Sequence, residues 1–144
     1  MVKKNYFLIF FIVFLSTFSL LKIFNNVVNL DTYEYGEWLI NYQSGFIRRG
    51  LSGEIIFQIS KVFGNNLQLT FFIILSLICL IFYRLNYILL KKIKFNFFTI
   101  LVLFSPLLYF FFILINGVGI RKEILLFIFY LWYLLSISNK SFNK

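Results

Sequence analysis

The sequence has no histidine and no alanine, a single cysteine, a single proline and five acidic residues among its 144 positions. Without histidine, the chain lacks the commonest general base and metal ligand. Cys79 can form no internal disulfide, and no zinc site can be built from one cysteine alone. We therefore expect no metal site and no cofactor. Cys79 lies in an apolar run, where a free cysteine packs as a small hydrophobic residue.

Apolar residues are abundant instead: 61% of the chain is hydrophobic and 23% is aromatic. Soluble domains are usually about 45–50% apolar, and one small globular core has too little interior to hide this surplus. The composition therefore predicts a protein whose solvent is lipid. The net charge of +9 does not indicate a nucleic-acid partner, because the basic residues lie between apolar runs rather than on one soluble face.

Four apolar runs predict an all-α, multi-pass integral membrane protein with one transmembrane domain over residues 1–144. The predicted spans are about 6–24, 67–90, 95–115 and 120–137. The first would extend roughly 28 Å as a helix, close to the hydrocarbon thickness of a bilayer. A cleaved signal peptide is the alternative, but no small-residue cleavage site follows the run. Pro106 is expected to kink the third span, and the fourth is short.

Lysine and arginine placement predicts an orientation with both termini in the cytoplasm of the cell that carries this membrane. Eight basic residues then lie inside: Lys3, Lys4, Arg84, Lys91, Lys92, Lys94, Lys140 and Lys144. Six lie outside: Lys22, Arg48, Arg49, Lys61, Arg121 and Lys122. All five acidic residues fall outside as well. Arg84 is expected to reach the inner surface, with Asn86 and Tyr87 at the interface.

The first external loop, residues 25–66, contains two predicted amphipathic helices. Asp31 and Glu34 resemble a capping box, and aromatic or apolar residues follow at helical spacing: Tyr35, Trp38, Leu39 and Tyr42. The second helix has one apolar side: Leu51, Ile55, Ile56, Ile59, Val62 and Phe63. Its polar side carries Glu54, Gln58 and Lys61. Thirteen residues are too few to span, so this helix should lie on the membrane or dip into it.

A glycine-rich basic motif lies between these helices, with Gly45, Gly50 and Gly53 around Arg48 and Arg49 and with Glu54 at its end. Adjacent arginines offer planar, bidentate donors for phosphate or carboxylate, and glycine permits close approach of a ligand. A lipid pyrophosphate head group would suit this chemistry. The alternative is that both arginines contact lipid phosphates nonspecifically or pair with Glu54 and Glu37.

The second external turn repeats this combination, with two glycines before Arg121, Lys122 and Glu123. We expect that it can meet the first loop above the bundle, so that basic residues and carboxylates share one external site. The alternative is an ordinary helix start whose cations reach the lipid head groups.

The segment from Asp31 to Glu54, together with Gly119-Ile-Arg121-Lys122-Glu123, resembles multi-pass bacterial membrane proteins of capsule, exopolysaccharide or O-antigen synthesis. The layout also resembles the polyprenyl-phosphate-dependent glycosyltransferases of the GT-C type. That resemblance implies a loop carboxylate as catalytic base: Asp31, with Glu34 and Glu37 as alternatives. It implies that Arg48 and Arg49 hold the lipid phosphate. Asp31 also has a purely structural account as a helix cap.

These observations give a hypothesis and an alternative. The hypothesis is a membrane component of cell-surface polysaccharide synthesis that handles a polyprenyl-linked sugar at the extracytoplasmic face. If it is an enzyme, it is a glycosyltransferase or a polysaccharide polymerase. The alternative is a non-catalytic subunit or scaffold that packs against other membrane subunits. Enzymes of the GT-C type have many more helices, so we also consider that the chain is the N-terminal part of a longer protein.

Overall fold

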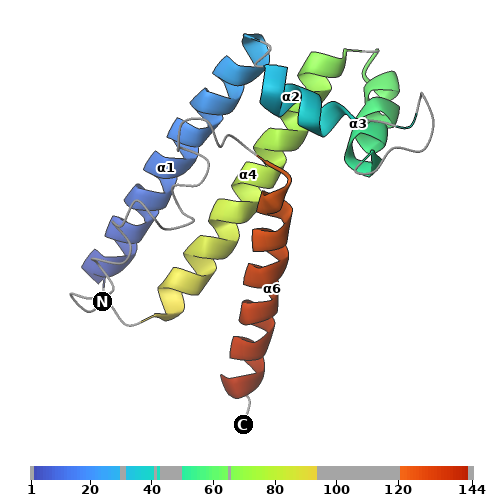
Figure 1. The fold of residues 1–144 in the computed structure, drawn as a ribbon. Coiled ribbons are helices and arrows are strands. Elements are labelled where there is room, and N and C mark those ends of the chain that lie inside the picture. Colours follow the sequence, from blue (N-terminus) through green and yellow to red (C-terminus); the bar gives the residue numbers. More distant parts are fainter. Residues whose placement is uncertain are drawn as a thin grey trace.

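A computed structural model describes residues 2–29, 32–40, 42, 50–64, 66–93 and 121–142, and within them the side chains at 6–29, 36–40, 42, 50–64, 66–93 and 121–137. This part of the chain is helical and contains no strand. Its elements are α1 (Val2–Val28), α2 (Thr32–Leu39), α3 (Leu51–Val62), α4 (Leu67–Lys92) and α6 (Glu123–Phe142) (Figure 1).

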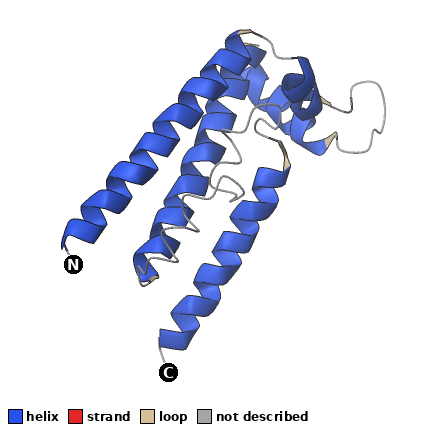
Figure 2. Ribbon diagram, turned by 60° about the vertical axis from the view of Figure 1, so that its left-hand side comes forward, coloured by secondary structure: helices blue, strands red, loops and turns tan. Residues whose placement is uncertain are grey.

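Helix α4 is the centre of the arrangement, because it packs against α1, α3 and α6, while α2 packs on α3. Helices α1 and α4 lie side by side and antiparallel (Figures 1 and 2). Their buried residues recur every three or four positions, as expected for one helical face. On α1 these residues are Leu8, Phe11, Ile12, Leu15, Ser19, Ile23 and Val27, and on α4 they include Phe71, Leu75, Cys79, Phe82, Tyr83, Asn86 and Leu90.

Polar groups tie α1 to α4 at two heights. The hydroxyl groups of Ser19 and Tyr83 form a buried hydrogen bond of 2.8 Å, and the Cys79 thiol lies beside Ser19. Near the α2–α3 end, the Gln68 side-chain amide donates to the carbonyl oxygen of Val27 at 2.7 Å. That bond satisfies a carbonyl in the last turn of α1, where intrahelical donors are missing.

The outward surfaces of the long helices are apolar. On α1, Phe10, Phe14 and Phe18 are at least half exposed and stack in sequence, with ring centroids 6.3 and 5.0 Å apart. The segments Tyr6–Val28 and Leu67–Lys92 are long and apolar enough to cross a membrane. The apolar part of α6, Glu123–Ile137, is shorter. Such exposed aromatic rows are unfavourable in water and suit contact with lipid chains.

Helix α6 runs in the same direction as α4, away from α2 and α3, and it begins part-way along α4 rather than at its end (Figures 1 and 2). Both chain termini lie at the end opposite to α2 and α3. The predicted third span and Pro106 lie outside the described residues.

Several sequence-based boundaries differ from the structure. Helix α1 continues to Val28, four residues past the predicted end. Lys22 is only partly buried, so it does not end the helix. The helical hydrogen bonding continues beyond it, since Asn29 N donates to Asn25 O at 2.9 Å. Helix α2 ends at Leu39, so Tyr42 lies beyond it. Asn86 is fully buried against other side chains; its side-chain amide donates to the Phe82 carbonyl at 2.9 Å.

Candidate ligand site between α2 and α6

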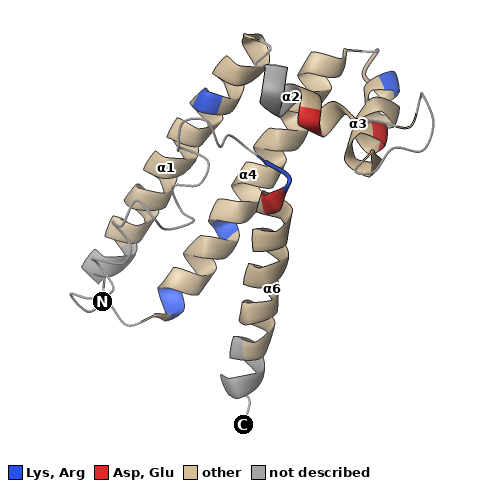
Figure 3. Ribbon diagram, viewed as in Figure 1, with Lys and Arg blue, Asp and Glu red and all other residues tan. Residues whose placement is uncertain are grey.

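Helix α2 and the start of α6 line an open pocket with a volume of about 320 Å³. Its lining residues are Glu37 from α2 and Lys122, Glu123, Leu125 and Leu126 from the beginning of α6. The acidic side chains that the structure describes, Glu37, Glu54 and Glu123, all lie around α2, α3 and the start of α6 (Figure 3). We call the space beside Glu37 and Lys122 the α2–α6 cavity.

Close packing of α2 on α3 sets the position of Glu37. Its neighbour Trp38 is 2% exposed and belongs to the main core. Gly53 of α3 lies directly under the end of α2: a Cβ atom there would be 2.6 Å from the carbonyl carbon of Ile40 and 2.7 Å from that of Leu39. The sequence suggested that Gly53 makes room for a ligand, but the backbone it accommodates is the protein's own.

The Glu54 carboxylate accepts hydrogen bonds from two groups near the start of α3. One carboxylate oxygen accepts from the backbone N–H of Tyr42 at 3.4 Å. The other accepts from the side-chain amide of Gln58 at 2.6 Å. Its backbone N–H donates to the Gly50 carbonyl at 3.0 Å, where α3 begins. These contacts give Glu54 a structural role at the first turn of α3, where a carboxylate also complements the helix dipole.

Several charged side chains at the cavity are partly buried. Glu37, Arg121 and Lys122 are each partly buried, and Glu123 is exposed. One carboxylate oxygen of Glu37 and the Nε atom of Arg121 are fully buried. Burying charged groups is costly unless they are compensated, and ionisable side chains at membrane depth usually mark functional sites. Glu123 has a simpler account, because an acidic residue in the first turn of α6 stabilises that helix.

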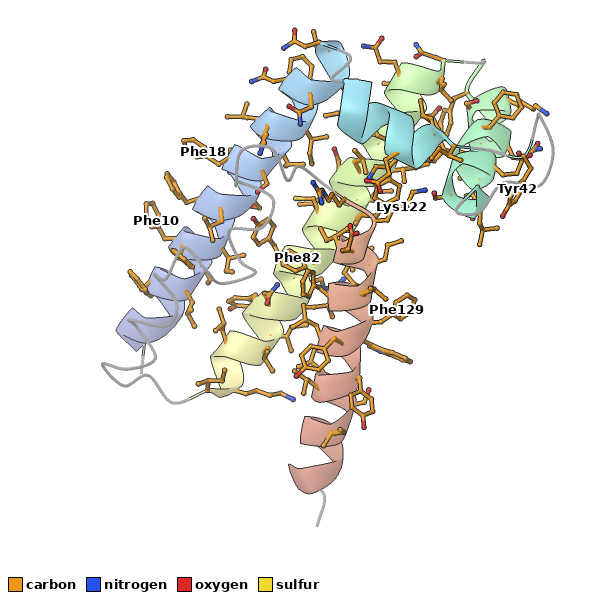
Figure 4. All side chains as sticks on the ribbon, viewed as in Figure 1. Phe10, Phe18, Tyr42, Phe82, Lys122 and Phe129 are labelled. Atoms are coloured by element: carbon orange, nitrogen blue, oxygen red, sulfur yellow. The ribbon has the colours of Figure 1, made fainter. Side chains whose placement is uncertain are left out.

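The apolar part of the lining comes from two leucines in the first turn of α6. Leu125 is partly buried, and Leu126 is 69% exposed on the outer surface of α6. Phe129 continues the same exposed side one turn further and is 65% exposed (Figure 4, where Lys122 and Phe129 are labelled). The lining of the α2–α6 cavity therefore combines charged side chains with two leucines, one of them exposed on the outer surface of α6. That combination fits a molecule with a charged head and an apolar tail.

The structure brings together only some of the residues singled out from the sequence. Glu37, Lys122 and Glu123 share the cavity, with Arg121 preceding them. Gly50 and Gly53 are buried at the start of α3. Asp31, Gly45, Arg48 and Arg49 lie outside the described residues, and of Glu34 only its place in α2 is described. Leu125 and Leu126 were not singled out, since in the sequence they are two more apolar residues of a predicted span.

Comparison with known protein families places the chain. The model of the family "Uncharacterised membrane protein Rv1490" matches residues 6–115, which is most of the sequence. The chain belongs to this family. The match includes α1, α2, α3 and α4, and therefore Glu37, and it ends before α6. No curated protein and no solved structure matches the chain.

Membership of the Rv1490 family agrees with the two long apolar helices, and together they identify a membrane protein in contact with lipid. The exposed phenylalanines of α1 suit contact with acyl chains.

Proposed function

We propose that this protein handles a lipid-linked, phosphate-bearing sugar at the extracytoplasmic face of the cell membrane, as a component of surface polysaccharide synthesis. The observation that carries the proposal is the α2–α6 cavity, which joins Glu37 and Lys122 to the exposed Leu126. A polyprenyl phosphate has the matching parts: an anionic head for the lysine and an apolar tail that remains in the bilayer. Proteins commonly bind phosphate through lysine as a point charge.

The proposed orientation puts both termini in the cytoplasm and the α2–α6 cavity outside. Lys91 and Lys92 at the far end of α4 support it, because basic residues flanking spans are enriched on the cytoplasmic side. The parallel directions of α4 and α6 support four spans. If both cross the bilayer in the same direction, the chain between them crosses it once in the opposite direction, as proposed for residues 95–115.

In the proposed reaction, Glu37 acts as the general base and accepts the proton of an acceptor hydroxyl group. The hydroxyl oxygen bonds to the anomeric carbon of the donor sugar, and the bond from that carbon to the phosphate oxygen breaks. The lipid phosphate leaves as an anion, and Lys122 stabilises its charge. No change of oxidation state occurs. Asp31 and Glu34 remain alternative bases in this proposal, with Arg48 and Arg49 as further phosphate contacts.

Binding of a polyprenyl phosphate to the purified protein in lipid nanodiscs tests the proposal, with affinity read by native mass spectrometry. Losing a charge-assisted contact costs about 1.5–3 kcal/mol, so Lys122→Gln should weaken binding roughly 10- to 100-fold. Lys91→Gln at the far end of α4 makes the same change in charge outside the cavity and is the matched control. Equal affinity in both variants would refute the proposed site.

A separate measurement addresses chemistry. Glu37→Gln keeps the size of the side chain and removes its basicity, so lipid binding should persist while surface polysaccharide is lost in cells that carry the variant. Normal polysaccharide with Glu37→Gln would exclude Glu37 as the base. The non-catalytic subunit is favoured by one feature, the exposed aromatics Trp132 and Tyr133 of α6, at 64% and 61%. It predicts that both cavity variants behave as the parent protein.

A further inference from the structure

Helix α3 carries an apolar surface that the described part of the protein does not cover. Its members are Leu51, Ile55, Ile59 and Val62, which we call the α3 stripe. They are 63%, 49%, 36% and 82% exposed. At 100° per residue these positions fall within about a quarter of the helix circumference. The stripe is therefore one continuous band along the whole of α3.

The other residues of α3 form two further sides, one buried against the protein and one polar. Gly53, Ile56 and Ser60 are buried against the protein. Gln58 and Lys61 are exposed on the polar side, which also carries Glu54. The sequence placed Ile56 on the same apolar side as the stripe, but the structure separates them: Ile56 is 2% exposed and packs in the core. Helix α3 thus presents three sides, one to the protein, one polar and one apolar.

We propose that α3 is inserted into the outer leaflet of the bilayer that α1 and α4 cross, with the α3 stripe against acyl chains and the Gln58 side facing head groups and water. Twelve residues extend roughly 18 Å, too short to cross a bilayer but suited to one leaflet or its surface. A helix with this division of apolar and polar sides is typical of membrane interfaces.

Two observations select lipid as the occupant. First, α3 packs directly on α4, whose apolar length suits a membrane-crossing helix, so α3 lies against a helix that is expected to be surrounded by lipid. Second, the charges fit: Lys61, near the end of α3, is exposed on the polar side, with its Nζ atom 4.8 Å from the centre of the Phe57 ring. A lysine with its stem along an apolar surface can reach lipid phosphates.

The proposal assigns α3 a second role, as the element that sets the depth of the α2–α6 cavity. Helix α2 rests on α3 through the contact of Gly53 with the end of α2, and Glu37 belongs to α2. The height of α3 in the leaflet therefore fixes the height of Glu37. This inference does not depend on which molecule the cavity binds.

Site-directed spin labelling in vesicles of phosphatidylcholine and phosphatidylglycerol tests the proposal. In a Cys79→Ser background, Val62→Cys and Ile55→Cys place labels on the stripe, and Gln58→Cys is the matched control on the same helix. Oxygen concentrates in acyl chains, whereas a water-soluble nickel complex does not enter them. We expect the ratio of oxygen to nickel accessibility to be several-fold higher at positions 55 and 62 than at position 58.

Two results would overturn the proposal. A ratio at 55 and 62 equal to that at 58 would put the stripe in water. Low accessibility to both reagents at 55 and 62 would mean that another protein or a second copy covers the stripe. Val62 is 82% exposed, so a label there displaces nothing in the described fold. Quenching of Val62→Trp fluorescence by brominated lipids gives an independent measurement of the same contact.

Discussion

Ser19 and Tyr83 make a hydrogen bond of 2.8 Å between α1 and α4 at a level where both side chains are fully buried. Hydroxyl groups in such a place have no water to bond, so each needs the other. Measured interhelical hydrogen bonds in membranes are nevertheless modest, about 0.6 kcal/mol on average and up to about 1.7. The pair therefore aligns the two helices more than it stabilises them.

Tyr83→Phe tests this pair. It removes one hydroxyl and leaves that of Ser19 buried, so we expect a loss of about 1 kcal/mol in the free energy of unfolding. The measurement is reversible unfolding in detergent micelles. Ser19→Ala and the double variant complete a cycle in which the coupling energy should be about 0.6 kcal/mol. Strictly additive effects would mean that the hydroxyl pair contributes no coupling.

The sequence pointed to the chemistry of single residues better than to their surroundings. Glu37 and Lys122 stand out because charged residues are rare in so apolar a chain, and both line the α2–α6 cavity. Their pairing across 85 residues needed the folded structure. Nothing in the sequence indicated that Asn86 is buried in the core, since a polar residue near a span end is typical of the interface; α4 extends past it by six residues and the core encloses it.

Among the elements, α2 and α3 depend on one close backbone contact. Gly53→Ala would put a Cβ atom against the carbonyl groups of Leu39 and Ile40, and neither backbone group can move without displacing α2. We expect a loss of about 1–3 kcal/mol and weaker ligand binding in the α2–α6 cavity, because Glu37 moves with α2. Thermal unfolding and the nanodisc binding measurement check the two effects.

Gly36→Ala is the control, since it makes the same change in α2, where a Cβ atom would meet nothing within 4 Å. Alanine is the better helix former, so this variant should be more stable by about 0.5–1 kcal/mol. If Gly53→Ala were as stable as Gly36→Ala, the close approach of α2 and α3 would be wrong.

Sequence periodicity located α3 well but not its surroundings. The predicted helix began at Leu51 and ended at Phe63, and the structure has Leu51–Val62. Its apolar side was nevertheless read as one surface. In a membrane protein, residues that face protein and residues that face lipid are both apolar, so spacing alone cannot separate Ile56 from Ile55. Packing against α2 and α4 makes that distinction.

At the scale of the whole molecule, the directions of α1, α4 and α6 predict which ends share a side of the membrane. With four spans, reporters fused after Ile93 and after Lys144 should report the cytoplasm, and one inserted after Gly64 the outside. Ser44→Cys in a Cys79→Ser background should react with an impermeant maleimide on intact cells. Labelling of Ser44→Cys only after lysis would reverse the proposed orientation.

Composition was enough to predict a helical membrane protein, and the Rv1490 family agrees. Composition does not determine the number of spans. Helices α1 and α4 meet the length for crossing, whereas the apolar part of α6 would extend only roughly 22 Å. A short span is tolerated when the bilayer thins or neighbouring helices cover its end. Here the start of α6 borders the pocket that α2 also lines, an arrangement that apolar run length could not reveal.

The late position of Lys122 in the chain has a consequence for biogenesis. A ribosome delivers α1, α2, α3 and α4 to the membrane first, and these can already pair through Ser19 and Tyr83. The wall of the α2–α6 cavity that carries Lys122 arrives only with α6. Nascent or truncated chains that stop before α6 would therefore insert and pack, yet have no cavity. Under the proposed function, a polyprenyl phosphate is held only after α6 has joined the four helices before it.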